Sequence, residues 1–214
     1  TVELCREYTD KVLQREYRSA AEQKNFALQH ATSDYVLIVD ADERVTPELA
    51  SEIRDLLEGD DLKNVYLVPR RLIFHGRWLR RGGLYPARRP RFFRREAARF
   101  RDQRVHAPLL CEGEAGHLHN DVVHYSFRDV ADLMRRINDF SSRRAQDCVE
   151  EGRRARWYHF IWPVIYFVRN YLLRGGFLDG VPGLCVWWMM TTYQFALWAK
   201  VWEGQRGRPR QPRQ

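Results

Sequence analysis

The fold is decided by the stretch Tyr35-Val36-Leu37-Ile38-Val39-Asp40-Ala41-Asp42-Glu43. Its first five residues form an uninterrupted apolar run, which is typical of a strand covered on both faces in a parallel sheet. Thr46, Pro47 and Glu48 follow, and they supply an N-cap, a proline at the first helical position and an acid in the first turn. We therefore predict a central parallel strand that leads, past two acidic residues, into a helix.

The neighbouring segments continue this alternation of strand and helix. Ser19 can cap an earlier helix, and residues 11–15 and 65–68 are strand candidates on either side. Alternating helices and strands indicate an α/β fold of the Rossmann-like type with a mostly parallel sheet. A capping box over residues 126–129 predicts a further helix that begins at Val130.

Two carboxylates lie two residues apart where the apolar strand ends. In an open parallel sheet, ligands collect beyond the carboxyl ends of the strands. Mg²⁺ and other hard cations prefer oxygen ligands and commonly bind through one or two carboxylates together with substrate phosphates. Asp40 and Asp42 therefore suit a site in which Mg²⁺ or Mn²⁺ holds a nucleoside diphosphate. The alternative is a solvated turn with an acid near the start of a helix.

Positive charge is concentrated in one segment. The net charge is +8, and residues 69–104 hold thirteen arginines against Glu96 and Asp102, which amounts to +11. Such a segment favours an anionic partner, namely a diphosphate, a phosphorylated glycolipid, a membrane surface or a nucleic acid; the alternative is a solvated basic loop. Its aromatic residues would suit single-stranded nucleic acid. However, it matches no common nucleic-acid-binding motif, so we expect no nucleic-acid partner.

Two uncharged runs, at 157–168 and 180–199, dominate the last quarter of the chain. About 20 apolar residues are needed to cross a bilayer, so the first run is too short and the second is diluted by threonine and glutamine. We predict an interfacial helical hairpin on an anionic membrane surface. The alternative is that these helices pack on the rest of the chain or on a second protomer. The scattered cysteines form no C-x-x-C pair and favour a reducing compartment.

Seven short motifs occur in order along the chain. They are Q-K-N-F-A-L (23–28), Y-V-L-I-V-D-A-D-E (35–43), G-L-Y-P (83–86), R-F-F-R-R (91–95), R-V-H (104–106), H-Y-S (124–126) and G-G-F-L-D-G (175–180). Together they resemble glycosyltransferase family 2, in the branch typified by the lipopolysaccharide core beta-1,4-glucosyltransferases. The resemblance implies a GT-A fold, a divalent metal, a nucleotide-sugar donor such as UDP-glucose, a lipopolysaccharide-core or other glycolipid acceptor, and inversion at the anomeric carbon. It also implies that the family's first strands and a D-S-G-S-T-D-type loop are missing before Thr1.

The resemblance also suggests roles for individual residues. The candidate metal ligands are Asp40, Asp42 and His124. The arginines expected to bind the diphosphate or an acceptor phosphate are Arg91 and Arg94. The residues expected to line the donor pocket are Gln23 and Asn25.

The catalytic base is the point at which the sequence departs from the family. The branch usually has V-H-E, whose glutamate is the natural base, whereas this chain has Val105-His106-Ala107. Another carboxylate could serve, of which Glu43, Glu112 and Glu114 are nearest in sequence, or His106 could; the base stays unassigned among these. Alternatively, the protein is an impaired relative that serves as a membrane-associated scaffold. We expect a GT-A catalytic domain at 1–128, a membrane-associating helical region at 129–204 and a disordered basic tail at 205–214. The expected location is the cytoplasmic face of the bacterial inner membrane.

Overall fold

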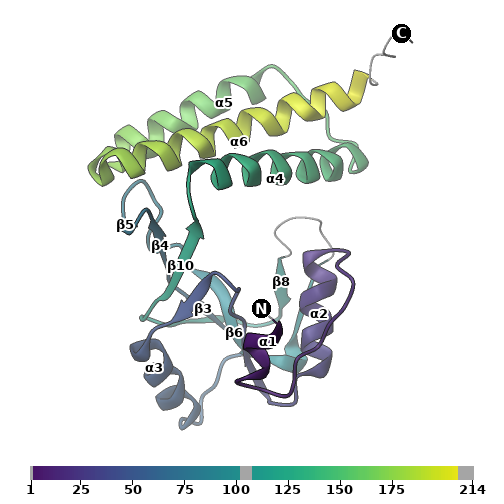
Figure 1. Cartoon of the computed structure of the whole chain (residues 1–214), viewed down its shortest axis with the longest axis vertical. Coiled ribbons are helices and arrows are strands. Elements are labelled where there is room, and N and C mark those ends of the chain that lie inside the picture. The colour runs from purple at the N-terminus through teal and green to yellow at the C-terminus, as the bar shows by residue number, and fades with distance from the viewer. Residues whose placement is uncertain (1, 102–107, 207–214) are drawn as a thin grey trace.

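A layer of long helices lies over one end of two small β-sheets (Figure 1). The computed structural model describes residues 2–101 and 108–206. The helices are α1 (Val2–Arg6), α2 (Ala20–His30), α3 (Pro47–Leu57), α4 (Val130–Glu150), α5 (Tyr158–Phe167) and α6 (Gly180–Arg206). Short helical turns are η1 (Arg95–Ala97), η2 (Val168–Leu173) and η3 (Gly176–Asp179). The strands are β1 (Tyr35–Leu37), β2 (Glu43–Val45), β3 (Val65–Val68), β4 (Arg70–Phe74), β5 (Arg77–Leu79), β6 (Arg89–Arg94), β7 (Ala98–Phe100), β8 (Leu109–Cys111), β9 (Ala115–His117) and β10 (Val122–Phe127).

The first sheet has the order β1-β6-β3-β9, and it corrects the predicted topology. Strand β1 lies at the edge and pairs antiparallel with β6, so the prediction of a central parallel strand is wrong. Across the described strands five pairings are antiparallel and two are parallel, so the predicted mostly parallel sheet is also wrong. An apolar run reports that both faces of a strand are covered, but it carries no information on the direction of the neighbouring strand.

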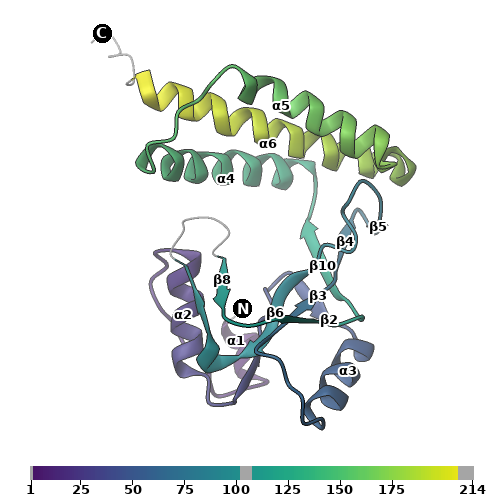
Figure 2. The same ribbon diagram turned by 180° about the vertical axis from the view of Figure 1, so that it is seen from behind.

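Coverage of both faces is what the structure confirms. Tyr35 and Leu37 pack into the cluster that contains α3, whereas Val36 and Ile38 pack into the cluster that contains α2. The two helices accordingly lie on opposite sides of the first sheet (Figure 2). The mixed α/β architecture is consistent with a GT-A fold.

Local capping signals confirm the starts of both of these helices. Ser19 Oγ accepts a hydrogen bond of 3.1 Å from the backbone N–H of Glu22 at the start of α2, and Thr46 Oγ1 accepts one of 3.2 Å from the N–H of Leu49 at the start of α3. Strand β3 has the bounds predicted for it. Residues 11–15, by contrast, form no strand.

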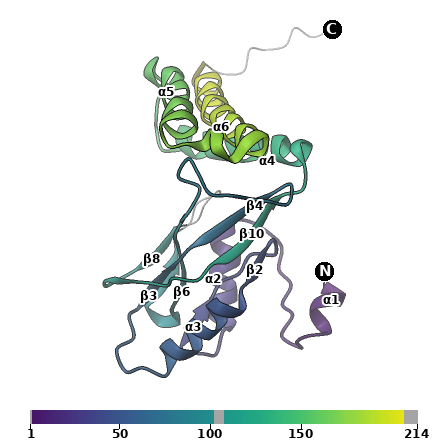
Figure 3. The same ribbon diagram turned by 90° about the vertical axis from the view of Figure 1, so that its left-hand side faces the viewer.

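The second sheet has the order β2-β10-β4-β5 and supports the helical layer. Strand β10 leads directly into α4 (Figure 3). The predicted helix is present, but Asp129 is its N-cap, with its carboxylate 2.7 Å from the N–H of Asp132, while Ser126 belongs to β10. Leu72, Leu79 and other apolar residues of the sheet pack against Leu133 and Val186 of α4 and α6.

The helices are held to the second sheet by a tight joint. Asp179, 5% exposed, accepts hydrogen bonds from the backbone N–H groups of Arg80 and Arg81, at 3.0 and 2.9 Å. The indole of Trp187 fills the space beside Gly176, where a Cβ atom would lie 2.7 Å from the indole nitrogen. The glycine-rich motif at 175–180 is therefore explained by close packing.

A hairpin of α5 and α6 forms the outer part of the helical layer. It turns through η2 and η3, and the glycines at 175 and 176 lie in this turn. Among the described residues, no helix is both long enough and apolar enough to span a bilayer. Helix α6 ends at Arg206, two residues beyond the predicted helical region, and most of the predicted tail lies outside the described residues.

Candidate functional site

A tight turn places the acidic stretch at the end of β1. The backbone N–H of Glu43 donates to the carbonyl of Asp40 over 2.9 Å, which reverses the chain into β2. Glu43 then pairs with His124 of β10, and the N–H of Tyr125 donates to the carbonyl of Asp42 over 2.8 Å. The turn therefore brings the acidic residues beside the H-Y-S motif, which lies about 80 residues later in the chain.

Arg91 organises one half of this turn. Its guanidinium lies 2.9 Å from Asp40 Oδ2 and 2.6 Å from Glu43 Oε1, and the Glu43 side chain is completely buried. The other oxygen of Glu43 accepts the N–H of Asp40 at 3.0 Å. Both Glu43 oxygens thus accept a hydrogen bond from a protein group while the side chain is fully buried, which favours a structural role over that of a catalytic base. Glu43 shapes the turn.

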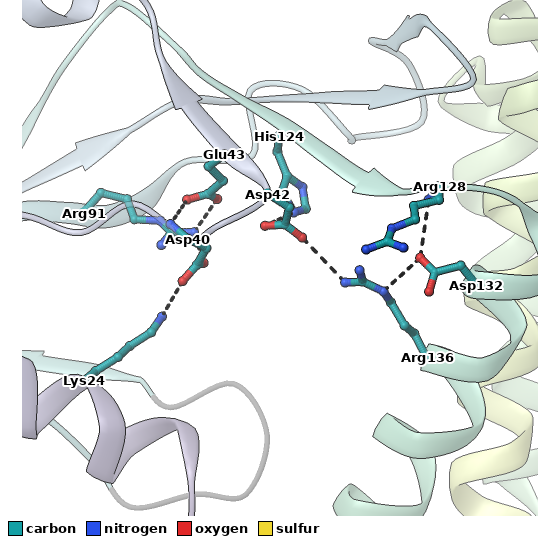
Figure 4. Close-up of polar contacts among 9 residues, drawn as sticks. All are labelled: Lys24, Asp40, Asp42, Glu43, Arg91, His124, Arg128, Asp132 and Arg136. Atoms are coloured by element: carbon teal, nitrogen blue, oxygen red, sulfur yellow. Dashed lines mark hydrogen bonds and ion pairs between the residues drawn. The ribbon is translucent and has the colours of Figure 1, made fainter. Parts of the chain in front are cut away.

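Asp42 faces two other side chains, an imidazole and a guanidinium. Its Oδ1 is 3.5 Å from Nε2 of His124, and its Oδ2 is 3.6 Å from a terminal nitrogen of Arg136 on α4. Figure 4 shows Asp42 between these two side chains, on the opposite side of the turn from Arg91. About a third of the Asp42 side chain is exposed. Asp42 is therefore the more loosely held of the paired acids, although Asp40, at 42%, is the more exposed.

Both aspartates are kept ionised by their neighbours. Burial tends to raise the pKa of Asp40, but the charges and hydrogen bonds of Arg91 and Lys24 outweigh it and hold the pKa below its ordinary value. The hydrogen bond from His124 holds the pKa of Asp42 below its ordinary value, against a smaller opposing effect of burial. Both carboxylates are therefore negatively charged at neutral pH.

A cavity of about 580 Å³ lies beside this turn, between α2 and β1. Gln23, Lys24 and Asp40 contribute to its lining, and Lys24 Nζ lies 3.3 Å from Asp40 Oδ1. Apolar residues of both elements complete the wall. The cavity thus combines an apolar surface with a charged end, where a polar ligand would be oriented.

Two of the predicted site residues do not join the cluster, and a third cannot be placed. Asn25 uses its side-chain amide to bind the backbone of Phe100, at 2.9 and 2.8 Å, and is absent from the cavity lining. Arg94 stacks over Tyr35 at the opposite end of β1 from the acidic turn. His106 lies outside the described residues.

Two cations of the cluster were not singled out from the sequence. Lys24 lies inside the Q-K-N-F-A-L motif between two residues that we did consider, so the motif itself was the available signal. Arg136 carried no signal, because an arginine four residues after Asp132 on a helix is an ordinary surface pair.

The cluster offers few protein ligands for a metal. Within residues 2–101 and 108–206, no three His, Cys, Asp or Glu side chains are grouped closely enough to hold a metal ion. Asp42 and His124 supply a carboxylate and an imidazole side by side. The arrangement suits a cation that takes its other ligands from a bound phosphate and from water.

Comparisons with known proteins agree with the motifs. The family described as Glycosyl transferase family 2 matches residues 1–110. The chain is 28% identical over 211 residues to LpsC, a lipopolysaccharide core biosynthesis glycosyltransferase of Rhizobium meliloti (strain 1021). The aligned region covers 95% of this chain and 78% of LpsC. It is 24% identical over 200 residues to an uncharacterized glycosyltransferase of Rickettsia typhi, which covers 85% of this chain and 68% of the relative. The similarity to these relatives therefore extends beyond residue 110 into the helical layer.

Proposed function

The chain belongs to glycosyltransferase family 2, and from this premise we propose that it is an inverting enzyme of lipopolysaccharide core assembly. The proposed donor is a nucleotide-sugar, UDP-glucose in the first instance, and the proposed acceptor is a lipopolysaccharide core or a related glycolipid. The similarity to LpsC supports the class of acceptor. The observation that carries the proposal is the acidic turn itself: ionised Asp40 lies with Lys24 at the charged end of a cavity, and Asp42 of the same turn faces His124.

Asp42 and His124 are the residues that we propose as ligands of Mg²⁺ or Mn²⁺. Their facing atoms are 3.5 Å apart, and His124 Nδ1 is buried without a hydrogen-bond partner in the described structure. Binding of the metal would replace the hydrogen bond from Nε2 to Asp42 and would leave the imidazole proton on Nδ1. When bound, the metal would help to neutralise the charge that develops on the leaving diphosphate.

The remaining residues have distinct proposed roles. Arg91 and Glu43 fix the turn, so that Asp40 is presented at the end of the cavity with a constant geometry. Lys24, in the cavity wall, places a positive charge where an anionic donor would lie. Because both oxygens of Glu43 accept hydrogen bonds inside the protein, the candidates that we retain for the catalytic base are His106, Glu112 and Glu114.

We propose that the hairpin of α5 and α6 rests on the inner membrane at its cytoplasmic face. Large apolar side chains are exposed along it, and they include Trp157, Ile161, Val164, Leu172, Leu173, Phe177, Leu178, Val181 and Trp188. Arginines at 153, 154, 156, 169 and 174 would meet anionic lipid, with about 1 kcal/mol each near the surface. This orientation would bring the enzyme to a glycolipid acceptor while the donor arrives from the cytoplasm.

Release of UDP from UDP-glucose in the presence of a lipopolysaccharide-core acceptor tests the proposal. We expect metal-dependent turnover that EDTA abolishes. Asp42→Asn should lower the rate about a thousandfold, because a neutral amide is a poor ligand for the cation, whereas Asp55→Asn on the exposed face of α3 should leave it unchanged. Turnover that survives both EDTA and Asp42→Asn would remove the metal from the mechanism. Failure of the full-length protein to turn over any donor would favour the scaffold function.

A further inference from the structure

Arg136 belongs to α4, yet its guanidinium reaches the acidic turn. Its Nε lies 3.2 Å from Asp132 Oδ2, and the same oxygen accepts the backbone N–H of Arg128 at 3.3 Å. The Asp132 side chain is only 15% exposed, so this anchor is largely protected from water. Asp132 therefore holds the Nε side of the guanidinium and leaves its terminal nitrogens directed away from α4, toward Asp42 (Figure 4).

The contact between Arg136 and Asp42 is looser than the others in the site. The terminal nitrogen is 3.6 Å from Asp42 Oδ2, whereas Arg91 lies within 2.9 and 2.6 Å of its two carboxylates. The Arg136 side chain is also 35% exposed, so solvent can replace the contact at little cost. Such a geometry fits a guanidinium that contacts Asp42 when no ligand is present and that can bind a different anion when one arrives.

We propose that Arg136 is the residue through which the helical region binds the diphosphate of the donor. This inference rests on the proposed function, because it takes Asp42 as the carboxylate that a divalent cation would occupy. A divalent metal ion bound to Asp42 would neutralise this carboxylate and would bring the phosphate oxygens of the donor beside it. The guanidinium, anchored at Nε by Asp132, then presents its terminal N–H groups to those oxygens, for which its planar shape is suited. The family match ends at residue 110, so Arg136 would bind the diphosphate from a part of the chain outside the matched region.

Two opposite effects follow from replacing Arg136 with alanine. Without a ligand, Arg136 competes with an incoming cation for Asp42, so Arg136→Ala should bind Mn²⁺ alone more tightly. With a diphosphate present, the variant lacks an anion contact, so it should bind the complex of Mn²⁺ and inorganic pyrophosphate more weakly. Two unit charges about 4 Å apart interact by about 1 kcal/mol in water, so each change should be about fivefold.

The experiment compares the full chain, Arg136→Ala, Arg136→Lys and a control, Arg143→Ala. Arg143 lies on the same helix and is exposed. Mn²⁺ binding is followed by the paramagnetic resonance signal of free Mn²⁺, and binding of preformed manganese pyrophosphate by calorimetry. Arg136→Lys keeps the charge but loses the planar fork, so we expect near-normal Mn²⁺ affinity together with weaker pyrophosphate binding.

Changes of opposite sign in Arg136→Ala, with no change in Arg143→Ala, support the inference. A loss of affinity for both ligands would show that Arg136 only supports the local structure and would overturn it. Values equal to those of the Arg143→Ala control would overturn it as well, while the proposed metal site would stand. If the unaltered chain binds neither ligand, the proposed metal site fails and the role of Arg136 fails with it.

Discussion

Replacing Arg91 with methionine removes the cation from a buried carboxylate. The Glu43 side chain is fully buried, the Arg91 side chain is 10% exposed, and their charged atoms are 2.6 Å apart. Loss of one partner of such a pair leaves an uncompensated buried charge and typically costs about 3–5 kcal/mol of unfolding free energy. Glu43→Gln keeps the size of the side chain and an acceptor for the Asp40 N–H, so we expect a smaller loss of about 1–3 kcal/mol.

The double variant, Arg91→Met with Glu43→Gln, measures the energetic coupling between the two side chains. With the carboxylate neutralised, loss of Arg91 no longer leaves a buried charge. The two substitutions together should therefore destabilise the protein by about 1–3 kcal/mol less than the sum of the single effects. Arg99→Met on β7 is the matched control, because Arg99 is exposed, and it should change the unfolding free energy by less than about 0.5 kcal/mol.

Urea denaturation followed by circular dichroism is the suitable assay. All tryptophans except Trp78 lie between residues 157 and 202, so fluorescence would follow mainly the helical layer and would miss the sheets. Two results would refute the reasoning. The first is an Arg91→Met variant as stable as Arg99→Met. The second is a double variant whose loss equals the sum of the two single losses.

Three further predictions concern acidity, packing and the membrane. Neighbouring cations lower the pKa of Asp40 in the folded state. Its contribution to stability is therefore present above the unfolded pKa of about 4 and is lost as the pH falls through the lowered folded value. Asp40→Asn should consequently flatten the acid limb of a plot of urea midpoint against pH. Gly176→Ala should destabilise by about 1–3 kcal/mol in thermal unfolding, since its Cβ would lie 2.7 Å from the Trp187 indole, and an unchanged midpoint would contradict the packing. In flotation with anionic liposomes, Leu173→Asp on the exposed turn of the helical hairpin should weaken binding while Leu57→Asp on α3 should not, and a chain that never floats would argue against membrane contact.

The parts of the fold that depend on local chemistry could be predicted from the sequence. The starts of α2 and α3 follow from a hydroxyl side chain that caps the N–H groups of the next turn, which is decided within four residues. The two-face coverage of β1 follows equally from its own apolar side chains. Ser126 shows the limit of such patterns, because the strand pairing of β10 claims it and Asp129 becomes the cap.

The parts that depend on distant segments could not be predicted in the same way. The partner of β1 is β6, more than 50 residues later, and no local periodicity states whether that pairing is parallel. For the same reason the sequence placed Asp40 and Asp42 in one site but could not separate their partners. Asp40 belongs with Arg91, and Asp42 belongs with His124 and Arg136.

The joint around Asp179 has a consequence for the cooperativity of the whole chain. Asp179 holds the amide hydrogens of Arg80 and Arg81, and Trp187 packs beside the same loop. These amides lie in the loop between β5 and β6. We therefore expect them to exchange with deuterium only when the helical layer moves away from this loop. Their exchange rates report the opening of the helices. We therefore expect the loop and the helical turn, about a hundred residues apart, to open and close as one unit across the domain boundary predicted at residue 128.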